Sequence, residues 1–246
     1  MFTVGVDLAA EPKGTALAKI HWVSGKASLV GLQLGATDEV IVGLALGSDK
    51  IGIDCALGWP TEFVRFIANH AAGSHELTDG FGSSDWRREL SYRKTDRAVR
   101  SVTGRWPLSV ATDRLGVTAL RCAGLVSRLA EAGLGTSRDG SQDLVEIYPA
   151  ASMKIWGFET AGYRDSADIR ARLLVELQTT CPWLDLGSFA DLMTQSCDAF
   201  DAVIAALATR SAALGKSTVP APEQLKAAKL EGWIALPLTP VADLAG

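Results

Sequence analysis

The chain has 246 residues, of which 48% are hydrophobic and 21% are charged, and its formal net charge is −4. This composition is ordinary for a folded protein with a sizeable core, and the length accommodates one large α/β domain or two small ones. The negative net charge argues against a protein that coats nucleic acid by charge alone.

The first half of the chain predicts a meander of strands followed by α/β alternation. Three consecutive strands are predicted at residues 3–9, 15–23 and 27–35. Residues 38–47 predict a short helix or a crossover, and the β-branched run 50–55 predicts a buried strand. A helix is expected to begin near Thr61, and residues 73–85, rich in Gly, Ser and Asp, are expected to form a mobile loop.

The second half of the chain is mostly helical in its pattern. Helices are predicted at residues 112–132, 150–156, 166–179, 197–214 and 222–230. Thr112 and Asp113 are the expected cap of the first of these helices. A strand is predicted at 143–148, and residues 232–237 are expected to be extended. The whole order predicts a mixed α/β sheet with helices on both faces.

The cysteines and the N-terminal sequence indicate in which cellular compartment the protein is expected. The four cysteines, Cys55, Cys122, Cys181 and Cys197, form no Cys-x-x-Cys pair, so we expect free thiols in a reducing environment and no zinc site. No apolar stretch approaches the ~18 residues of a membrane span. Because the N-terminus has no signal-peptide pattern, we expect a cytoplasmic location and no membrane partner.

Four aspartates are the main candidates for function. Asp7 and Asp54 each follow a short β-branched run, where burying an unpaired carboxylate costs several kcal/mol. Asp198 and Asp201 stand at i and i+3, so they share one helix face. Alternatively, the helix pair complements the helix dipole, and either strand aspartate bonds a neighbouring backbone amide. Brought to one point, the four carboxylates would form a divalent-metal site.

A basic stretch lies between Trp86 and Pro107, although the chain as a whole has a negative net charge. We expect four of its arginines to bind phosphates, namely Arg87, Arg88, Arg93 and Arg97. The aromatic residues expected to stack on bases are Trp86, Tyr92 and Trp106. The alternative is a solvated helix face with internal salt bridges. Asp96, inside the stretch, is expected to orient Arg93 or Arg97.

Several short segments, taken in order, carry a family resemblance. They are Gly5-Val6-Asp7, Ile53-Asp54-Cys55-Ala56-Leu57-Gly58-Trp59-Pro60, Tyr92-Arg93-Lys94-Thr95-Asp96-Arg97, Glu146-Ile147-Tyr148-Pro149-Ala150-Ala151, Asp198-Ala199-Phe200-Asp201-Ala202 and Glu231-Gly232-Trp233-Ile234. In the order of its acidic residues, which is a strand Asp, a hairpin, a second strand ending in Asp and a late helix with Asp-x-x-Asp, the chain resembles the ribonuclease H-like superfamily, its resolvase-like branch in particular. Through the segments above, over nearly its whole length, it resembles more closely the bacterial domain-of-unknown-function family 429, described as predicted nucleases.

The resemblance implies one ribonuclease H-like domain over residues 1–246, with an inserted basic, helical segment at about 73–112. Its mixed sheet would open with three antiparallel strands and continue with parallel ones. It also implies a nuclease in which Asp7, Asp54, Asp198 and Asp201 bind Mg²⁺ or Mn²⁺, the ions that oxygen ligands select. Two ions about 3.5–4 Å apart would support hydrolysis of a phosphodiester in DNA or RNA. Resolvase-like enzymes are often dimers, so a homodimer is an open expectation.

The chain departs from the resolvase pattern at its second acidic position, which is Asp54 rather than Glu. Glu146, near the end of its own strand, is either the missing longer ligand or the partner of an arginine in the basic stretch.

Two other functions compete with the nuclease. Asp7 with Gly14-Thr15 resembles the phosphate-binding hairpin of actin-like and sugar-kinase-like nucleotide-binding proteins. A non-catalytic scaffold of the same fold would use Arg93 and its neighbours to bind a partner or a nucleic acid.

Overall fold

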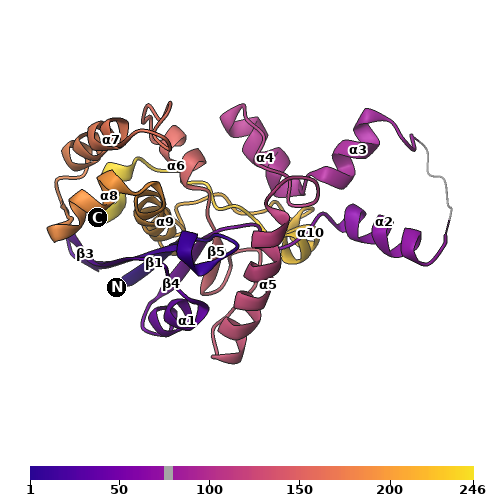
Figure 1. Cartoon of the computed structure of the whole chain (residues 1–246), viewed down its shortest axis with the longest axis horizontal. Helices are drawn as coiled ribbons and strands as arrows, with labels where there is room; N and C mark the ends of the chain where they lie inside the picture. The colour runs from indigo at the N-terminus through magenta and orange to yellow at the C-terminus, as the bar shows by residue number, and fades with distance from the viewer. Residues whose placement is uncertain (75–79) are drawn as a thin grey trace.

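One six-stranded mixed sheet organises the protein. In this computed structural model, which describes residues 1–74 and 80–246, its strands are β1 (Phe2–Asp7), β2 (Ala16–Val23), β3 (Lys26–Leu34), β4 (Lys50–Asp54), β5 (Leu144–Glu146) and β6 (Leu184–Asp185). The strand order is β5-β4-β1-β2-β3-β6 (Figure 1). The first three strands pair antiparallel, whereas β4, β5 and β6 join the sheet in parallel. This confirms the predicted mixed α/β sheet.

Helices cover both faces of that sheet. The α-helices are α1 (Asp38–Leu46), α2 (Thr61–Ala71), α3 (Ser84–Ser91), α4 (Lys94–Thr103), α5 (Gly116–Glu131), α6 (Pro149–Ile155), α7 (Ala167–Thr180), α8 (Ala190–Gln195), α9 (Cys197–Ala213) and α10 (Leu225–Glu231). Short 3-10 turns occur at Pro12–Gly14, Gly187–Phe189 and Val241–Ala245. One hydrophobic core joins the sheet to α1 and α5, and another joins its opposite face to α6, α7, α8 and α9.

The alternation of side chains along β1 decides which of them point to each face of the sheet. Val4 and Val6 pack into the core with α1 and α5. Thr3 and Gly5 face α9 instead: the Thr3 hydroxyl donates to the Ala206 carbonyl at 3.0 Å, and a Cβ at Gly5 would overlap the backbone of α9. Because side chains alternate with a period of two, Asp7 falls on the α9 face as well.

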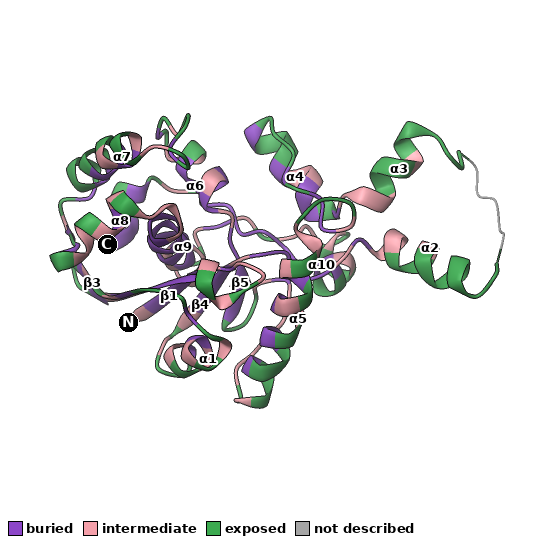
Figure 2. Ribbon diagram, in the orientation of Figure 1, coloured by how far each residue is buried: buried purple, intermediate pink, exposed green. Residues whose placement is uncertain are grey.

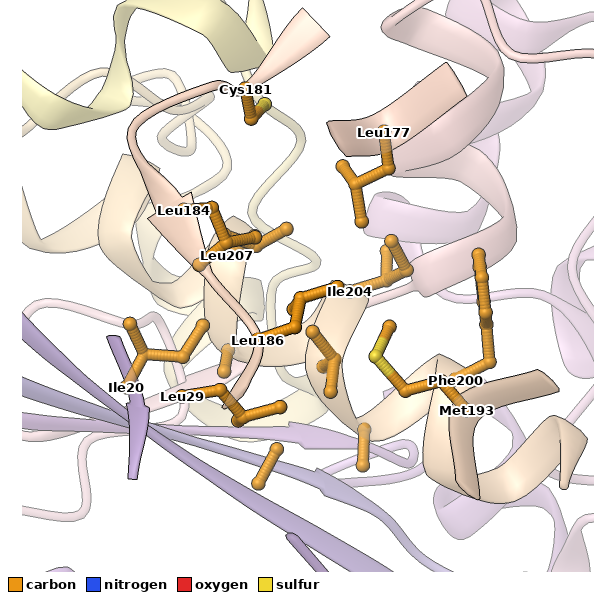
Figure 3. Packing of buried hydrophobic residues seen from close by; sticks show 14 of the residues in the cluster. Ile20, Leu29, Leu177, Cys181, Leu184, Leu186, Met193, Phe200, Ile204 and Leu207 are labelled. Atoms are coloured by element: carbon orange, nitrogen blue, oxygen red, sulfur yellow. The ribbon is translucent and has the colours of Figure 1, made fainter. Parts of the chain in front are cut away.

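Helix α9 is the central buried helix of the protein (Figure 2). Its side chains Phe200, Ile204 and Leu207 lie between strand residues such as Ile20 and the outer layer that includes Leu177 (Figure 3). On the sheet side α9 approaches two glycines, Gly5 and its register partner Gly52. This close approach sets the distance between the first turns of α9 and the ends of β1 and β4.

Helices α2 and α3 extend away from the sheet (Figure 1). Every residue of these two helices is exposed or half-buried. Aromatic contacts join them, since Trp86 meets Phe66 edge-on at 5.4 Å and Phe81 at 4.7 Å between ring centroids. The expected mobile loop at 73–85 lies partly outside the described residues, and α3 begins within it at Ser84.

Some sequence-based details differ from the structure. The helix expected to be capped by Thr112 and Asp113 begins at Gly116, because the Asp113 carboxylate accepts the Ser109 amide at 2.7 Å instead. The two-residue β6 and the short α8 were not predicted, since neither is long enough to show a periodic pattern. The four cysteines are free thiols, as expected. None of the helices in the described part of the chain is long and apolar enough to cross a membrane.

Candidate functional site

Asp7 and Asp54 lie side by side at the ends of two neighbouring strands. They are register partners in the parallel pair β1 and β4, so their side chains point to the same face of the sheet. Both are half-buried, and both line one cleft of about 650 Å³. The sheet thus brings together two carboxylates that are 47 positions apart in the sequence.

The beginning of α9 supplies the second pair of carboxylates. The Ser196 hydroxyl caps the helix by accepting the Ala199 amide, which places Asp198 in the first turn and Asp201 one turn later. Asp201 is 3% exposed, and both of its carboxylate oxygens lie near the Tyr163 hydroxyl, at 3.0 and 3.1 Å. Tyr163 donates this hydrogen bond from the cleft wall, and so ties Asp201 to the cleft.

The pKa values show that these carboxylates share one electrostatic environment. Burial, followed by the charges of Asp54, Asp201 and Asp198, raises the pKa of Asp7 to about 9. Burial and the charge of Asp201 raise the pKa of Asp54 well above its ordinary value. Burial also raises the pKa of Asp201, to about 6, against the opposing effects of Arg164 and the Tyr163 hydrogen bond. Full ionisation of the four carboxyl groups would therefore place more negative charge here than the surroundings neutralise, and Asp7 retains its proton at neutral pH.

A divalent cation fits the chemistry of this donor set. In the described ranges, no group of three His, Cys, Asp or Glu side chains has the geometry to hold a metal ion. The four aspartates nevertheless offer only oxygen donors, which suit Mg²⁺ or Mn²⁺. A cation would also offset the burial and the mutual repulsion that together raise the pKa of Asp7.

Besides Arg93, three arginines from separate segments line the same cleft. They are Arg105, which follows α4, Arg114, which precedes α5, and Arg164, in the loop between α6 and α7. Arg164 also donates to the Tyr163 hydroxyl, with its Nε at 3.5 Å. Arg114, Tyr163 and Arg164 were not predicted from the sequence, because loop residues carry no periodic signal. Arg105 lies in the predicted basic stretch between Trp86 and Pro107.

Glu146 is the partner of an arginine, the second of its two predicted roles. Arg93 reaches both of its carboxylate oxygens, with distances of 2.7 and 2.8 Å. Arg93 also bonds both carboxylate oxygens of Asp96 and the Glu231 carbonyl. All five N–H groups of the guanidinium donate within the protein, so none is left for the phosphate that we expected Arg93 to bind.

The other expected substrate-binding residues lie on or beside α3 and α4. Arg88 pairs with Asp85 at 3.1 Å on the surface, and Arg87 donates to the Gly82 carbonyl. Trp86 contacts α2, as described above, and Arg97 is half-buried on α4. Tyr92 stacks on Trp106 with ring centroids 4.1 Å apart. Of the residues expected to bind substrate, Arg93 and Trp106 are the ones that line the cleft with Asp7 and Asp54.

Comparisons with known proteins identify the family. No curated protein and no solved structure matches the chain significantly. A family model described as "Protein of unknown function (DUF429)" matches residues 5–225, a range that contains Asp7, Asp54, Glu146, Asp198 and Asp201. Because this match spans most of the 246 residues, the chain belongs to domain-of-unknown-function family 429.

Proposed function

We propose that the protein is a divalent-metal-dependent nuclease, which hydrolyses phosphodiester bonds in nucleic acid. The observation that carries this proposal is the pairing of Asp7 with Asp54 at the ends of parallel strands, within the electrostatic range of Asp201. A site that gathers carboxyl groups whose ionisation is opposed by burial and by one another is costly for the fold. Such a cost is typical of a site that is organised for chemistry rather than for stability.

The four carboxylates come from two parts of the fold, the sheet and helix α9. Asp7 and Asp54 would provide metal ligands from the sheet, and Asp198 and Asp201 would provide them from α9. The bound metal would supply an activated water and charge stabilisation for the leaving oxygen. Tyr163 orients Asp201 through its hydrogen bond, so this ligand does not depend on solvent for its position.

The arginines of the cleft favour an anionic substrate. Arg105, Arg114 and Arg164 surround the space beside the carboxylates. Guanidinium groups bind phosphate oxygens through paired N–H donors, and the cleft contains these three besides the fully bonded Arg93. This local positive charge offers a phosphate site in a protein whose net charge is −4.

The nucleotide-binding alternative receives less support from the hairpin between β1 and β2. The Thr15 hydroxyl donates to the Glu11 carbonyl at 3.2 Å and accepts from the Ala9 amide and the Arg121 guanidinium. Thr15 is also fully buried. This hydroxyl is already bonded, so it is not available to a nucleotide phosphate.

A cleavage assay tests the nuclease proposal. Labelled single-stranded DNA, RNA and branched DNA would be incubated with the protein in Mg²⁺, Mn²⁺ or EDTA. We expect cleavage only with a divalent metal, and a loss of about 10²-fold or more in Asp7→Asn and Asp54→Asn, since each removes a ligand of the metal that would stabilise the transition state. Asp191→Asn is the matched control, because Asp191 is exposed on α8, away from the cleft. Cleavage in EDTA, undiminished cleavage by Asp7→Asn, or no cleavage of any substrate would contradict the proposal.

A further inference from the structure

We propose that the nucleic acid bound at this site is a single strand, with one base stacked on Trp106 and the adjoining backbone held by Arg97 and Arg100. This inference rests on the proposed function, because it names the substrate class of the same cleft. It adds a second subsite, beyond the carboxylates, on the surface between α3 and α4.

Trp106 stands between two hollows of the surface. It lines the cleft that contains Asp7 and Asp54. It also lines a second hollow of about 360 Å³, formed by Asp85, Arg88, Glu89, Arg97, Arg100 and Trp106 itself. A nucleic-acid strand that leaves the cleft across Trp106 therefore enters the second hollow directly.

The indole ring of Trp106 is fixed in a position where a nucleic-acid base could stack on it. One face of its indole is stacked on Tyr92, with ring centroids 4.1 Å apart and planes inclined by 25°. The residue nevertheless remains 36% exposed, and this exposed surface borders both hollows. A ring that is supported by a stacked neighbour and is still exposed provides a stacking surface at little cost in side-chain entropy.

The second hollow has guanidinium groups to bind a phosphate. Arg88 already pairs with Asp85, and Glu89 is the other carboxylate in the lining. Arg97 and Arg100 form no salt bridge with any residue that the structure describes. The buried Nε of Arg97 also has no hydrogen-bond partner in the described part of the chain. These two arginines, one turn apart on α4, are therefore open to an anion.

Stacking on Trp106 favours a single strand over a duplex. In a duplex both faces of each base are covered by its neighbours, and extruding one base costs a few kcal/mol. A base in a flexible single strand turns onto an aromatic side chain without that cost. The stacked nucleotide would lie directly beside the phosphate in the cleft.

Binding measurements in EDTA test this inference without cleavage. Fluorescence anisotropy would compare single-stranded DNA, single-stranded RNA and a blunt DNA duplex. We expect tighter binding of the single strands, and the DNA and RNA arms distinguish which sugar is preferred. Trp106→Leu should weaken single-strand binding about 5- to 150-fold, as expected for loss of one stacked base. Trp106→Phe should retain most of the affinity, because it keeps an aromatic face.

The salt dependence of binding tests the two arginines separately. The double variant Arg97→Ala/Arg100→Ala should reduce the slope of log K against log salt by about 1.4, roughly 0.7 for each lost phosphate contact. Arg172→Ala, an exposed arginine on α7, is the matched control and should leave the slope unchanged.

The outcomes separate this inference from the proposed function. Equal or tighter binding of duplex, equal affinities of Trp106→Leu and Trp106→Phe, or an unchanged salt slope would overturn the inference. Metal-dependent cleavage that persists alongside any of these results would leave the nuclease proposal intact. A protein that neither binds nor cleaves any nucleic acid would overturn both.

Discussion

Arg93 and Glu146 form a buried bidentate ion pair in the wall of the cleft that contains Asp7 and Asp54. Their terminal atoms lie 2.7 and 2.8 Å apart, and each residue is 2% exposed. One oxygen of Glu146 also accepts the Leu57 amide at 3.1 Å, three residues after Asp54. The pair therefore joins β5 and the start of α4 to the segment that follows the Asp54 strand.

Breaking this ion pair should destabilise the fold strongly. Arg93→Met would leave the buried carboxylates of Glu146 and Asp96 without their cation, so we expect a loss of about 3–5 kcal/mol in the free energy of unfolding, measured by urea denaturation. Arg93→Met/Glu146→Gln should recover part of that loss, because it removes one of the uncompensated charges. Arg128→Ala, whose pair with Glu39 is exposed, is the control and should hardly move the midpoint. A similar midpoint in all three variants would contradict the structural role of the pair.

The aspartate cluster should make the metal-free protein less stable as the pH rises. The pKa of Asp7 is about 9 in the folded protein and near 3.8 in an unfolded chain. Stability from this group is therefore present below about pH 4 and is lost as the pH rises through about 9, by at most about 1.4 kcal/mol per pH unit. We expect the melting temperature in EDTA to fall between pH 5 and pH 9.

Asp7→Asn should remove much of that pH dependence, because asparagine does not ionise. In EDTA at pH 8–9 the variant should melt at a higher temperature than the wild type, whereas Asp191→Asn should follow the wild-type curve. A variant that melts below the wild type at pH 9 would show that Asp7 does not carry this repulsion.

Divalent metal should stabilise the wild type. At a metal concentration about 100 times the Kd, binding would add about 2.7 kcal/mol to the free energy of unfolding. For a chain of this size that corresponds to a rise of roughly 5–10 °C in melting temperature. The rise should be absent or much smaller in Asp7→Asn and in Asp54→Asn, and retained in Asp191→Asn. An equal rise in all four proteins would place the metal elsewhere.

The position of α9 over the sheet should depend on Gly5. A methyl group at this residue would overlap the backbone of Ala202 and Ala206, so Gly5→Ala should cost about 1–3 kcal/mol in unfolding free energy. Gly43→Ala is the matched control, since Gly43 is exposed in α1 and its Cβ would meet nothing within 4 Å. That substitution should stabilise by up to about 1 kcal/mol, because alanine favours a helix over glycine. Equal chemical denaturation curves for the two variants would contradict close packing at Gly5.

Much of the fold could be predicted from local patterns. The strands that end at Asp7 and Asp54 appear within a residue or two of their expected limits, and the helix with Asp198 and Asp201 begins at the predicted Cys197. The proximity of Asp7 to Asp54 was predictable in part, because the carboxyl ends of parallel strands meet at one edge of a sheet. The cap at Thr112 and Asp113 was wrong, since a side chain that can cap a helix can equally bond a turn, as Asp113 does.

The sequence by itself determined where most of the strands and helices lie and that side chains alternate along the strand of Asp7, because these depend on side chains a few residues apart. Only the tertiary structure decided which buried charges pair. Glu146 meets Arg93 across 53 positions, and this contact removes both from the residues open to a ligand. It likewise decided that loop residues Arg164 and Tyr163 border the aspartates, since loops carry no periodicity. The physical reason is that a buried charge is satisfied by whichever partner the fold brings near, and sequence spacing does not encode that partner.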